Sequence, residues 1–313
     1  MIALAADVGG GHISCAIVEE RSIVASQSFP ADKAAGLRPL LPTVSNVLHR
    51  IADESGIALS DCAGLALSFC GLVNPLTGRI LSTNAKYDDG PSIDLPAWCR
   101  ESLGLDLRIE NDARMALLGE WYAGAGRGFN DLVMITLGTG IGGAAMIEGR
   151  LLRGKHFQAG CLGGHLTASY LGRTCTCGAI GCIEAEASEW ALREICAALP
   201  DIGRSSLARE PRITFEGLFR HAAAGDELAL RIRERCLTVW AAGAVSLIHA
   251  YDPEMVLFGG GVMQSAEVIL PFMQSYMDRH AWTPWGRVKA RTAHLGNEAA
   301  LLGAIPLLSQ EGA

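Results

Sequence analysis

Three cysteines and a histidine stand close together in the middle of the chain. Cys175, Cys177 and Cys182 fall within eight residues, and His165 precedes the first of them by ten positions. Three thiolates and one imidazole form a ligand set that zinc favours, and four protein ligands leave no open position on the metal. We therefore predict that these residues hold a structural Zn²⁺ ion. The alternative, a group of free buried thiols, is weaker because core cysteines rarely cluster at ligand spacing.

Glycine-rich loops follow three strand-like segments. Glycine allows the backbone to approach a polyphosphate closely and to point its N–H groups at it. Three such loops in one chain predict a site for the phosphates of ATP, although any single loop could be a tight turn. The loop residues are Gly9 and Gly10, then Gly138, Thr139 and Gly140, and finally Gly259, Gly260 and Gly261.

A carboxylate lies beside the first of these loops. Asp7 ends the first apolar segment, two residues before Gly9. In that place it can bind Mg²⁺ through water and help to hold the phosphates of ATP. The alternative is an aspartate that only forms the turn, because aspartate is common where strands end.

Two stretches match known nucleotide motifs only formally. Residues 138–143, GTGIGG, fit the dinucleotide pattern, but that pattern must open a helix, and AAMIEG after it is typical of a strand. Residues 149–156, GRLLRGKH, approach the P-loop pattern, but His156 stands where serine or threonine would bind Mg²⁺. Neither a dinucleotide-binding site nor a P-loop is predicted.

The elements that must position these residues mix strands and helices. Apolar strand-like segments flank the glycine loops, and helical stretches begin near residue 112, after the cysteine cluster and near residue 226. The first two loops share the plan strand–glycine loop–strand, and Gly9 and Gly138 lie 129 residues apart, which suggests an internal duplication. We predict an α/β fold with two lobes and no linker between them.

Composition limits the classes of protein to consider. The chain has 313 residues, of which 50% are hydrophobic and 19% charged, as in a globular protein. Its net charge of −7 argues against a general nucleic-acid binder. The ten cysteines do not suit a disulfide scaffold in a chain of this length, no basic leader opens the chain, and no segment is suited to span a membrane. We expect a cytoplasmic protein with reduced thiols, small-molecule partners, and neither nucleic acid nor membrane as a partner.

The cysteine motif resembles the signature of one protein family. Gly164 and His165, followed by CTCGAIGCIE up to Glu184, are similar to the motif of the ROK (repressor, open reading frame, kinase) family of sugar kinases and sugar-responsive repressors. Five further segments along nearly the whole chain resemble motifs of this family: DVGGGHI, NPLTGRILSTN, IENDA, LGTGIGG and DPEMVLFGGGV.

The resemblance implies a fold. It is the two-lobed fold of the actin-like ATPase and sugar-kinase superfamily, with duplicated ribonuclease H-like domains and, here, a zinc knuckle. We expect an N-terminal lobe at residues 1–113, completed by a C-terminal helix at 299–313, and a C-terminal lobe at 114–298. The family resemblance also favours a homodimer.

The resemblance also implies an activity, the ATP-dependent phosphorylation of a hexose or hexose derivative. Asp112 would be the general base on the attacking hydroxyl, and its place at a strand-to-helix junction suits this role because a helix N-terminus keeps a carboxylate ionised. The alternative is that Asp112 only caps the helix. Zinc would fix the loop that carries two of the sugar-binding residues. The residues expected to bind sugar hydroxyls are Asn84, Asn111, His165 and Glu184; for the last two, the alternative is a metal ligand and a surface carboxylate.

Two departures from the family pattern bear on activity. The family has Glu-x-Gly-His before the cysteines, and the glutamate binds sugar. This chain has Leu162 in that place, or Cys161 if one residue is inserted, and Gly11 stands where the family often has threonine. The loss of a hydrogen-bonding group can cost about 1–3 kcal/mol of sugar affinity. An unusual hexose substrate or a weak activity is therefore expected.

Two alternatives to a kinase belong to other classes of function. A sugar-responsive repressor would carry an N-terminal helix-turn-helix, but here the first strand is expected to begin at Ile2. A non-catalytic sugar- or nucleotide-binding relative that acts as a sensor is the second alternative, and Leu162 keeps it open.

Overall fold

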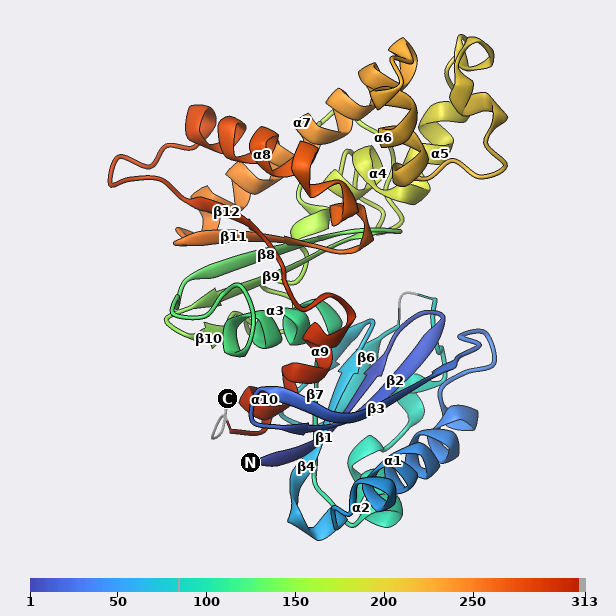
Figure 1. Ribbon diagram of the computed structural model, residues 1–313, viewed down its shortest axis with the longest axis vertical. Helices are drawn as coiled ribbons and strands as arrows, with labels where there is room; N and C mark the ends of the chain where they lie inside the picture. Colours follow the sequence, from blue (N-terminus) through green and yellow to red (C-terminus); the bar gives the residue numbers. More distant parts are fainter. Residues whose placement is uncertain (84, 310–313) are drawn as a thin grey trace. The chain divides into compact units, whose positions relative to one another are not determined.

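Two units, each built around a five-stranded sheet, form the computed structural model, which describes residues 1–83 and 85–309 (Figure 1). The first unit contains Met1–Gly128, Leu151–Cys161 and the described part of His294–Ala313. The second unit contains Phe129–Arg150 and Leu162–Ala293. Neither unit is therefore a single continuous stretch of chain.

The sheet of the first unit has the strand order β3-β2-β1-β4-β7. β1 pairs antiparallel with β2, and β2 antiparallel with β3, whereas β4 lies parallel to both β1 and β7. A separate pair of antiparallel strands, β5 and β6, follows β4 in the chain. The strands are β1 Ile2–Val8, β2 His12–Glu19, β3 Ser22–Pro30, β4 Cys62–Phe69, β5 Leu72–Asn74, β6 Arg79–Ser82 and β7 Leu107–Asn111.

Helices cover both faces of this sheet (Figure 1). α1 packs on β2 and β3, and α2 packs on β7. From the end of the chain, α9 and α10 return to pack on β1, β4 and α3. The helices of this unit are α1 Leu41–Ser55, α2 Leu95–Leu103, α3 Asp112–Tyr122, α9 Ala299–Leu302 and α10 Ala304–Ser309.

Side-chain size along β1 differs between the two faces of the sheet and suits the helices that pack on each face. Leu4, Ala6 and Val8 join an apolar cluster that includes the buried residues of α1. Ala3 and Ala5 are equally buried but lie outside that cluster. Because side chains alternate along a strand, the alanines belong to the face that α9 and α10 cover, where small side chains let the helices approach the sheet closely.

The second unit repeats the plan of the first sheet. Its strand order is β10-β9-β8-β11-β12. β8 pairs antiparallel with β9 and parallel with β11, which in turn lies parallel to β12. Order and direction thus match those of β2, β1, β4 and β7, which agrees with the predicted duplication. The strands are β8 Leu132–Leu137, β9 Ile141–Ile147, β10 Arg150–Leu151, β11 Met255–Gly259 and β12 Lys289–Thr292.

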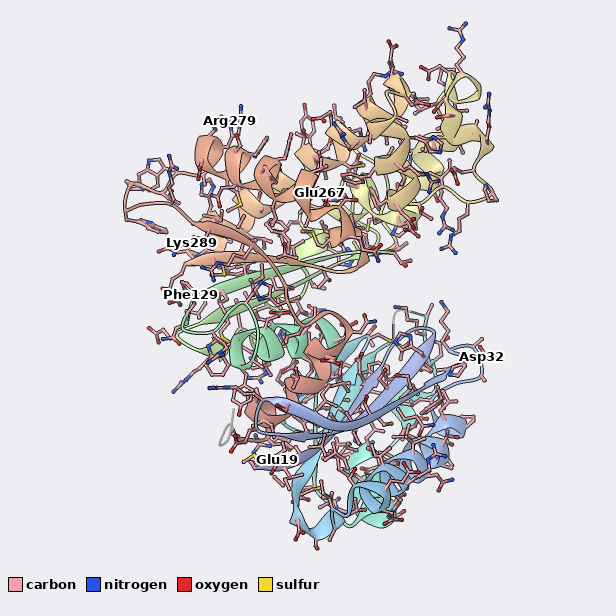
Figure 2. All side chains as sticks on the ribbon, in the orientation of Figure 1. Glu19, Asp32, Phe129, Glu267, Arg279 and Lys289 are labelled. Atoms are coloured by element: carbon pink, nitrogen blue, oxygen red, sulfur yellow. The ribbon has the colours of Figure 1, made fainter. Side chains whose placement is uncertain are left out.

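The long helix α7 organises the helical layer of the second unit. It packs against α4, α6 and α8, and α8 also packs on β12. On the exposed edge of β12, Nζ of Lys289 lies 5.4 Å from the centroid of the Phe129 ring (Figure 2). The helices are α4 Ile183–Ala187, α5 Glu189–Ala197, α6 Phe215–Ala223, α7 Glu227–Tyr251 and α8 Ala266–His280. Short 3₁₀ turns in the two units are Arg38–Leu40, Leu59–Asp61, Gly90–Ser92, Gly163–His165, Ile202–Arg204, Ser206–Arg209, Gly261–Ser265 and Gly296–Glu298.

Three local interpretations of the sequence can be compared with the elements. β9 follows the second glycine loop directly, so the rejection of a dinucleotide fingerprint at residues 138–143 is confirmed. α7, the helical stretch expected from near residue 226, begins at Glu227 and ends at Tyr251, before Asp252 and Pro253. The helical stretch after the cysteine cluster is divided at Ser188, because its hydroxyl accepts a hydrogen bond from the N–H of Ala191 at 3.3 Å and so begins α5.

All ten cysteines carry free thiols. Of the seven cysteines outside the candidate zinc cluster, six are buried and Cys161 is partly exposed. Within residues 1–83 and 85–309, no helix combines the length and the apolar character needed to cross a membrane.

Candidate active site

Asp7, Ser68 and Asn111 end, or nearly end, three adjacent parallel strands of the first unit. Asp7 on β1 pairs in register with Ser68 on β4, and the next residue of β4, Phe69, pairs with Asn111 on β7. The hydroxyl of Ser68 donates a hydrogen bond of 2.6 Å to Oδ1 of Asp7. Carboxyl ends of parallel strands meet at one edge of a sheet, which is where open α/β sheets bind ligands.

Asp7 is held in an environment that favours its neutral form. Burial raises the pKa of its carboxyl, although the hydrogen bond from Ser68 and the charge of His12 oppose that rise. A nearby cation would stabilise the ionised form of a carboxylate in such a place. These residues therefore fit the predicted cation-binding role of Asp7.

The first glycine loop, Gly9 to Gly11, joins β1 to β2. The N–H of Gly9 donates to the carbonyl of His12 at 3.1 Å, and the carbonyl of Gly9 accepts from the hydroxyl of Tyr87 at 2.6 Å. A side chain on Gly11 would meet no atom within 4 Å. The loop is thus anchored at Gly9 and open at Gly11.

Asn111 caps α3 and also holds Asp112. Its Oδ1 accepts from the N–H groups of Ala113 and Arg114 at 3.1 and 3.3 Å. Its Nδ2 donates to the carbonyl of Gly71 at 3.1 Å and to Oδ1 of Asp112 at 2.9 Å. The cap of the helix is therefore Asn111, whereas Asp112 is the first helical residue.

Asp112 has the pKa of a carboxyl that can exchange a proton near neutral pH. Burial first, and then the charge of Asp7, raise its pKa to about 6, against the opposing effects of the Ala113 N–H, of Lys86 and of Asn111. The N–H of Ala113 donates to Oδ1 of Asp112 at 2.8 Å, so both hydrogen bonds fall on the same oxygen. Oδ2 is left as the oxygen able to accept a proton from a substrate.

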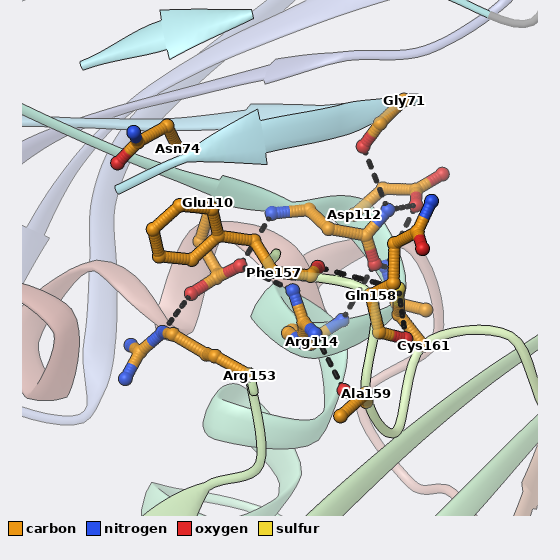
Figure 3. A network of polar contacts seen from close by, with 12 residues as sticks. Gly71, Asn74, Glu110, Asp112, Arg114, Arg153, Phe157, Gln158, Ala159 and Cys161 are labelled. Carbon is orange, nitrogen blue, oxygen red and sulfur yellow. Dashed lines mark hydrogen bonds and ion pairs between the residues drawn. The ribbon is translucent and has the colours of Figure 1, made fainter. Parts of the chain in front are cut away.

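A network of largely buried charged side chains lies next to Asn111 and Asp112 (Figure 3). Glu110 is fully buried, and its two oxygens pair with Nη1 of Arg114 at 3.3 Å and with Nε of Arg153 at 2.7 Å. Oε1 of Glu110 also accepts from the N–H of Asn111 at 2.9 Å. Arg114 in turn donates to the carbonyl of Ala159 at 2.6 Å. The network therefore ties residues 151–161 to the strand end that carries the two site residues.

The second glycine loop, between β8 and β9, is bound to the helices after the cysteine motif. The carbonyls of Gly138 and Thr139 accept from the N–H groups of Glu189 and Trp190 at 3.1 and 3.3 Å. Oε2 of Glu184 accepts from the N–H of Ile141 at 2.8 Å. Oε1 of Glu184 has only long contacts, with Trp190 at 3.4 Å and with Thr176 at 3.5 Å. Glu184 thus braces this loop with one oxygen, while its other oxygen accepts only long hydrogen bonds from the described residues.

The third glycine loop lies against the end of β8. Gly260 has φ +89°, and a side chain there would lie 2.2 Å from the carbonyl oxygen of Leu137. Both the dihedral angle and the close approach require glycine. Gly259 ends β11 and Gly261 begins a 3₁₀ turn, so the second and third loops are neighbours at the carboxyl ends of β8 and β11.

The four predicted zinc ligands come together in the second unit. Their candidate ligand atoms all lie within 4.8 Å of one another. Nδ1 of His165 is 3.5 Å from Sγ of Cys175, and Sγ of Cys177 is 3.6 Å from Sγ of Cys182. Ligands at the usual zinc distances of about 2.3 Å for sulfur and 2.0–2.1 Å for nitrogen stand roughly 3.5–3.8 Å apart in a tetrahedron. The donor set and its spacing fit Zn²⁺, and Nε2 of His165 remains for another partner.

The structure brings the predicted site residues together in two groups, one in each unit. The first group is Asp7, Gly9, Gly10, Asn111 and Asp112, and the second comprises the two later glycine loops, His165, Glu184 and the three cysteines. Asn84 lies outside the described residues. Sequence reasoning missed Ser68, Lys86 and the Glu110 network; only the spacing of Glu110 and Arg114, four residues apart, offered a signal.

Comparisons with known proteins decide the family. The family model described as ROK family matches residues 3–311. The chain belongs to the ROK family. A glucokinase of Thermotoga maritima is 32% identical over 275 residues, which cover 85% of this chain and 86% of that protein.

Solved ROK structures share the fold. A ROK hexokinase from Thermus thermophilus has a TM-score of 0.81 and 30% identity, over 98% of this chain and 97% of that one. A ROK family glucokinase from Streptomyces griseus, solved in complex with glucose and AMPPNP, has a TM-score of 0.78 and 26% identity, over 98% and 99%. The predicted two-sheet α/β architecture is confirmed.

The position of the missing ROK glutamate has no carboxylate. Leu162 is 43% exposed, and the glycines that follow it are buried. A side chain on Gly164 would lie 1.9 Å from the carbonyl oxygen of Ile141, so this turn requires glycine there. The thiol of Cys161 lies 3.4 Å from the carbonyl oxygen of Gln158. Neither Cys161 nor Leu162 supplies the lost acceptor.

Proposed function

We propose that this ROK chain is an ATP-dependent hexose kinase in which Asp112 is the general base. Asp112 is the observation that carries the proposal. It is a partly buried carboxyl with a pKa of about 6, it stands where a strand passes into a helix, and its Oδ2 accepts no hydrogen bond from the described residues. The full-length likeness to glucokinases supports the reaction class.

Asp112 accepts the proton of the attacking sugar hydroxyl. At neutral pH a carboxyl of this pKa is mostly ionised, yet more basic than an ordinary aspartate, which suits a general base. Asn111 holds the carboxylate in place through Nδ2 and has no hydrogen left to donate. A sugar hydroxyl that binds Nδ2 therefore replaces the bond to Gly71 or to Asp112.

The glycine loops bind the phosphates of ATP. In the second unit the loops at Gly138 and Gly260 present adjacent backbone turns at the carboxyl ends of two parallel strands, and in the first unit Gly9 and Gly10 do the same. Asp7 would hold Mg²⁺, which neutralises phosphate charge during transfer. The bound AMPPNP of the Streptomyces griseus relative supports ATP as donor.

Hydroxyls of the hexose are bound by Asn84, Asn111, His165 and Glu184. For Glu184 the available atom is Oε1, and for His165 it is Nε2, because their other donor or acceptor atoms face Ile141 and Cys175. Glucose is the first sugar to consider, because the relatives include glucokinases and one binds glucose. Without a carboxylate at Leu162, we expect weaker binding than in relatives that have one.

The zinc site, the assembly and the compartment belong to the same proposal. Zn²⁺ bound by His165 and the three cysteines fixes the segment that carries His165 and Glu184. Ten free thiols suit a reducing compartment such as the cytoplasm. The kinase forms a homodimer. A non-catalytic sensor is not favoured by the named relatives, which are glucokinases and a hexokinase.

Release of ADP in the presence of a sugar tests the proposed function. The purified chain is incubated with ATP, Mg²⁺ and a panel of aldoses, ketoses and N-acyl hexosamines, with glucose first. We expect ADP release that depends on both ATP and at least one hexose. Folded, zinc-loaded protein that releases no ADP with any sugar would instead be a non-catalytic member of the family.

A further inference from the structure

Lys86 lies between two residues of unusual backbone conformation. Ala85 and Tyr87 have φ +57° and φ +58°. Residues other than glycine uncommonly adopt this left-handed region, at a cost of about 1 kcal/mol or more each, and such residues cluster at functional sites. The turn that carries Lys86 is therefore kept in shape at the expense of local strain.

The turn is fixed to the first glycine loop. The fully buried Tyr87 donates its hydroxyl to the carbonyl of Gly9 at 2.6 Å, and its ring lies 6.2 Å from the ring of Phe69. The N–H of Lys86 donates to Thr83 at 3.0 Å, and that of Tyr87 to Lys33 at 3.0 Å. Lys86 thus has a defined position relative to the loop.

The side chain of Lys86 lies over Gly10. A side-chain carbon on Gly10 would be 3.5 Å from Cε and 3.7 Å from Nζ of Lys86. The ammonium also lowers the pKa of Asp112 and of Cys70, so its charge acts on the same end of the sheet. Within residues 1–83 and 85–309, Lys86 takes part in no ion pair. Lys86 is thus a partly buried cation that faces a bare backbone loop and has no directly paired carboxylate in the described part of the chain, although the charge of Asp112 interacts with it.

We propose that Lys86 is a further catalytic residue, whose ammonium binds the terminal phosphoryl group of ATP above Gly10. The inference rests on the proposed kinase function. In the transfer step the sugar oxygen bonds to the γ-phosphorus and its proton passes to Asp112. The bond from that phosphorus to the β,γ-bridging oxygen breaks, and ADP leaves with the electron pair. Lys86 exchanges no proton; its charge stabilises the negative charge on the transferring group.

A phosphate suits this position better than a neutral sugar. A lysine ammonium is a compact charge with three donors and no acceptor, so its strongest partners are anionic oxygens. The glycine loop leaves room for phosphate oxygens where a side chain would stand. A sugar hydroxyl at the same place would leave the charge uncompensated.

Nucleotide protection tests the contact without any turnover. The chain has only four lysines, Lys33, Lys86, Lys155 and Lys289, so their acylation rates can be followed separately by mass spectrometry. We expect ATP with Mg²⁺ to slow acylation of Lys86 at least several-fold, ADP to slow it less, and glucose alone to leave it unchanged. Lys289, exposed on β12, is the internal control. If ATP does not protect Lys86, or a sugar protects it as well as ATP does, the proposal is wrong.

Substitution tests the catalytic role. Lys86→Met should lower kcat by roughly 10²–10³-fold, as loss of one transition-state donor does, with the KM for sugar changed by less than about threefold. Lys86→Arg should recover part of the loss, and the control Lys289→Met should match the parent. Equal kcat in Lys86→Met, with its thermal midpoint preserved, would overturn the proposal. Should the parent phosphorylate no sugar, the proposed function fails, and the protection experiment still decides whether Lys86 binds ATP.

Discussion

The charge on Asp112 should weaken the fold that holds it, and this distinguishes the proposed general base from a carboxylate that only stabilises the fold. Its pKa is raised from 3.8 to about 6, chiefly by burial, so ionisation of this carboxyl destabilises the folded protein. The cost grows as the pH rises between these two values and is complete above about pH 6. Asp112→Asn removes the charge and keeps the shape. We expect turnover to fall by roughly 10²–10⁴-fold, while the free energy of unfolding at neutral pH stays equal or rises by about 1–3 kcal/mol.

A matched control separates this role from a general effect of charge. Asp106→Asn changes an aspartate whose side chain is 88% exposed, in the same unit, and should leave both turnover and stability near those of the parent. A coupled ADP assay and urea denaturation measure the two quantities. If Asp112→Asn turned over at the rate of the parent, Asp112 would not be the base.

The same pKa predicts how activity depends on pH. Below about pH 6 the carboxyl of Asp112 is protonated and can no longer accept a proton, so log kcat/KM should fall with a slope near one as the pH is lowered through that value. Asp7 and Asp112 influence each other, so the inflection belongs to the pair. Residual activity of Asp112→Asn should lack this inflection. A parent profile flat between pH 5 and 8 would contradict the assignment.

The residue scale also shows where sequence patterns stop being informative. A carboxylate between a strand and a helix could be found from the sequence, because the residues on either side of it predict both elements. The division of roles, with Asn111 as cap and Asp112 held by it, depends on side-chain geometry. The place of Lys86 in the site could not be predicted from the sequence. It depends on a strained turn and on a hydrogen bond from Tyr87 to Gly9, 78 residues away along the chain.

At the scale of elements, the cysteine segment is shaped by turns and has a very small apolar core. Between the 3₁₀ turn at His165 and helix α4 it forms two isolated bridges, Thr167 with Cys182 and Thr174 with Ile180, and further backbone hydrogen bonds of turns. Its apolar cluster contains just Cys175, Cys182 and Ala185, with Trp190 against it. A bound metal would therefore supply much of the folding energy of the segment.

Removal of the metal tests this dependence. We expect about one zinc per chain in freshly purified protein, and a chelator should lower the thermal midpoint and turnover together. Cys182→Ser should lose the zinc, whereas Cys196→Ser, a change at a buried cysteine outside the motif, should keep it. Elemental analysis and thermal melting measure both effects. A parent that folds and turns over fully with far less than one zinc per chain would refute the metal site.

Motif spacing located the candidate zinc ligands because all four lie within one short stretch of chain. The helix boundary beyond them was missed for the opposite reason: the composition from Ala185 to Leu199 suits one continuous helix. Ser188 interrupts it through a side-chain bond to the backbone, which competes with the helix. Such competition is decided by packing around the break, and the sequence alone does not describe that packing.

At the scale of the whole molecule, the first unit is completed from distant parts of the chain. The lobes expected at 1–113 and 114–298 assign residues 114–128, 151–161 and 294–298 differently from the observed units. The expected boundaries of the two lobes remain a prediction. Residues 151–161 join the first unit through hydrogen bonds of Arg153 and of the Ala159 carbonyl. Their partners are more than 40 residues away along the chain, so no local sequence pattern predicts these contacts.

The return of the chain end also positions the helix that begins with Asp112. A side chain on Gly119 in α3 would lie 1.9 Å from the carbonyl oxygen of Ala299 in α9, and one on Gly303 would lie 2.5 Å from the carbonyl oxygen of Met115. Two glycines, one on each side, thus allow the backbones to touch. Because backbone atoms meet here, the contact has no flexible side chain that could yield.

Gly119→Ala therefore tests whether the C-terminal helix α9 holds α3, the helix that begins with Asp112, in place. The added methyl must push α9 away from α3, so we expect a loss of roughly 1–3 kcal/mol in the free energy of unfolding, or more, and lower turnover as Asp112 shifts. Gly203→Ala is the matched control, since a methyl there meets no atom within 4 Å and its φ is not positive. Urea denaturation and the ADP assay compare both variants with the parent. Stability and turnover unchanged in Gly119→Ala would mean that α9 can move freely from α3, and that the C-terminal return does not position Asp112.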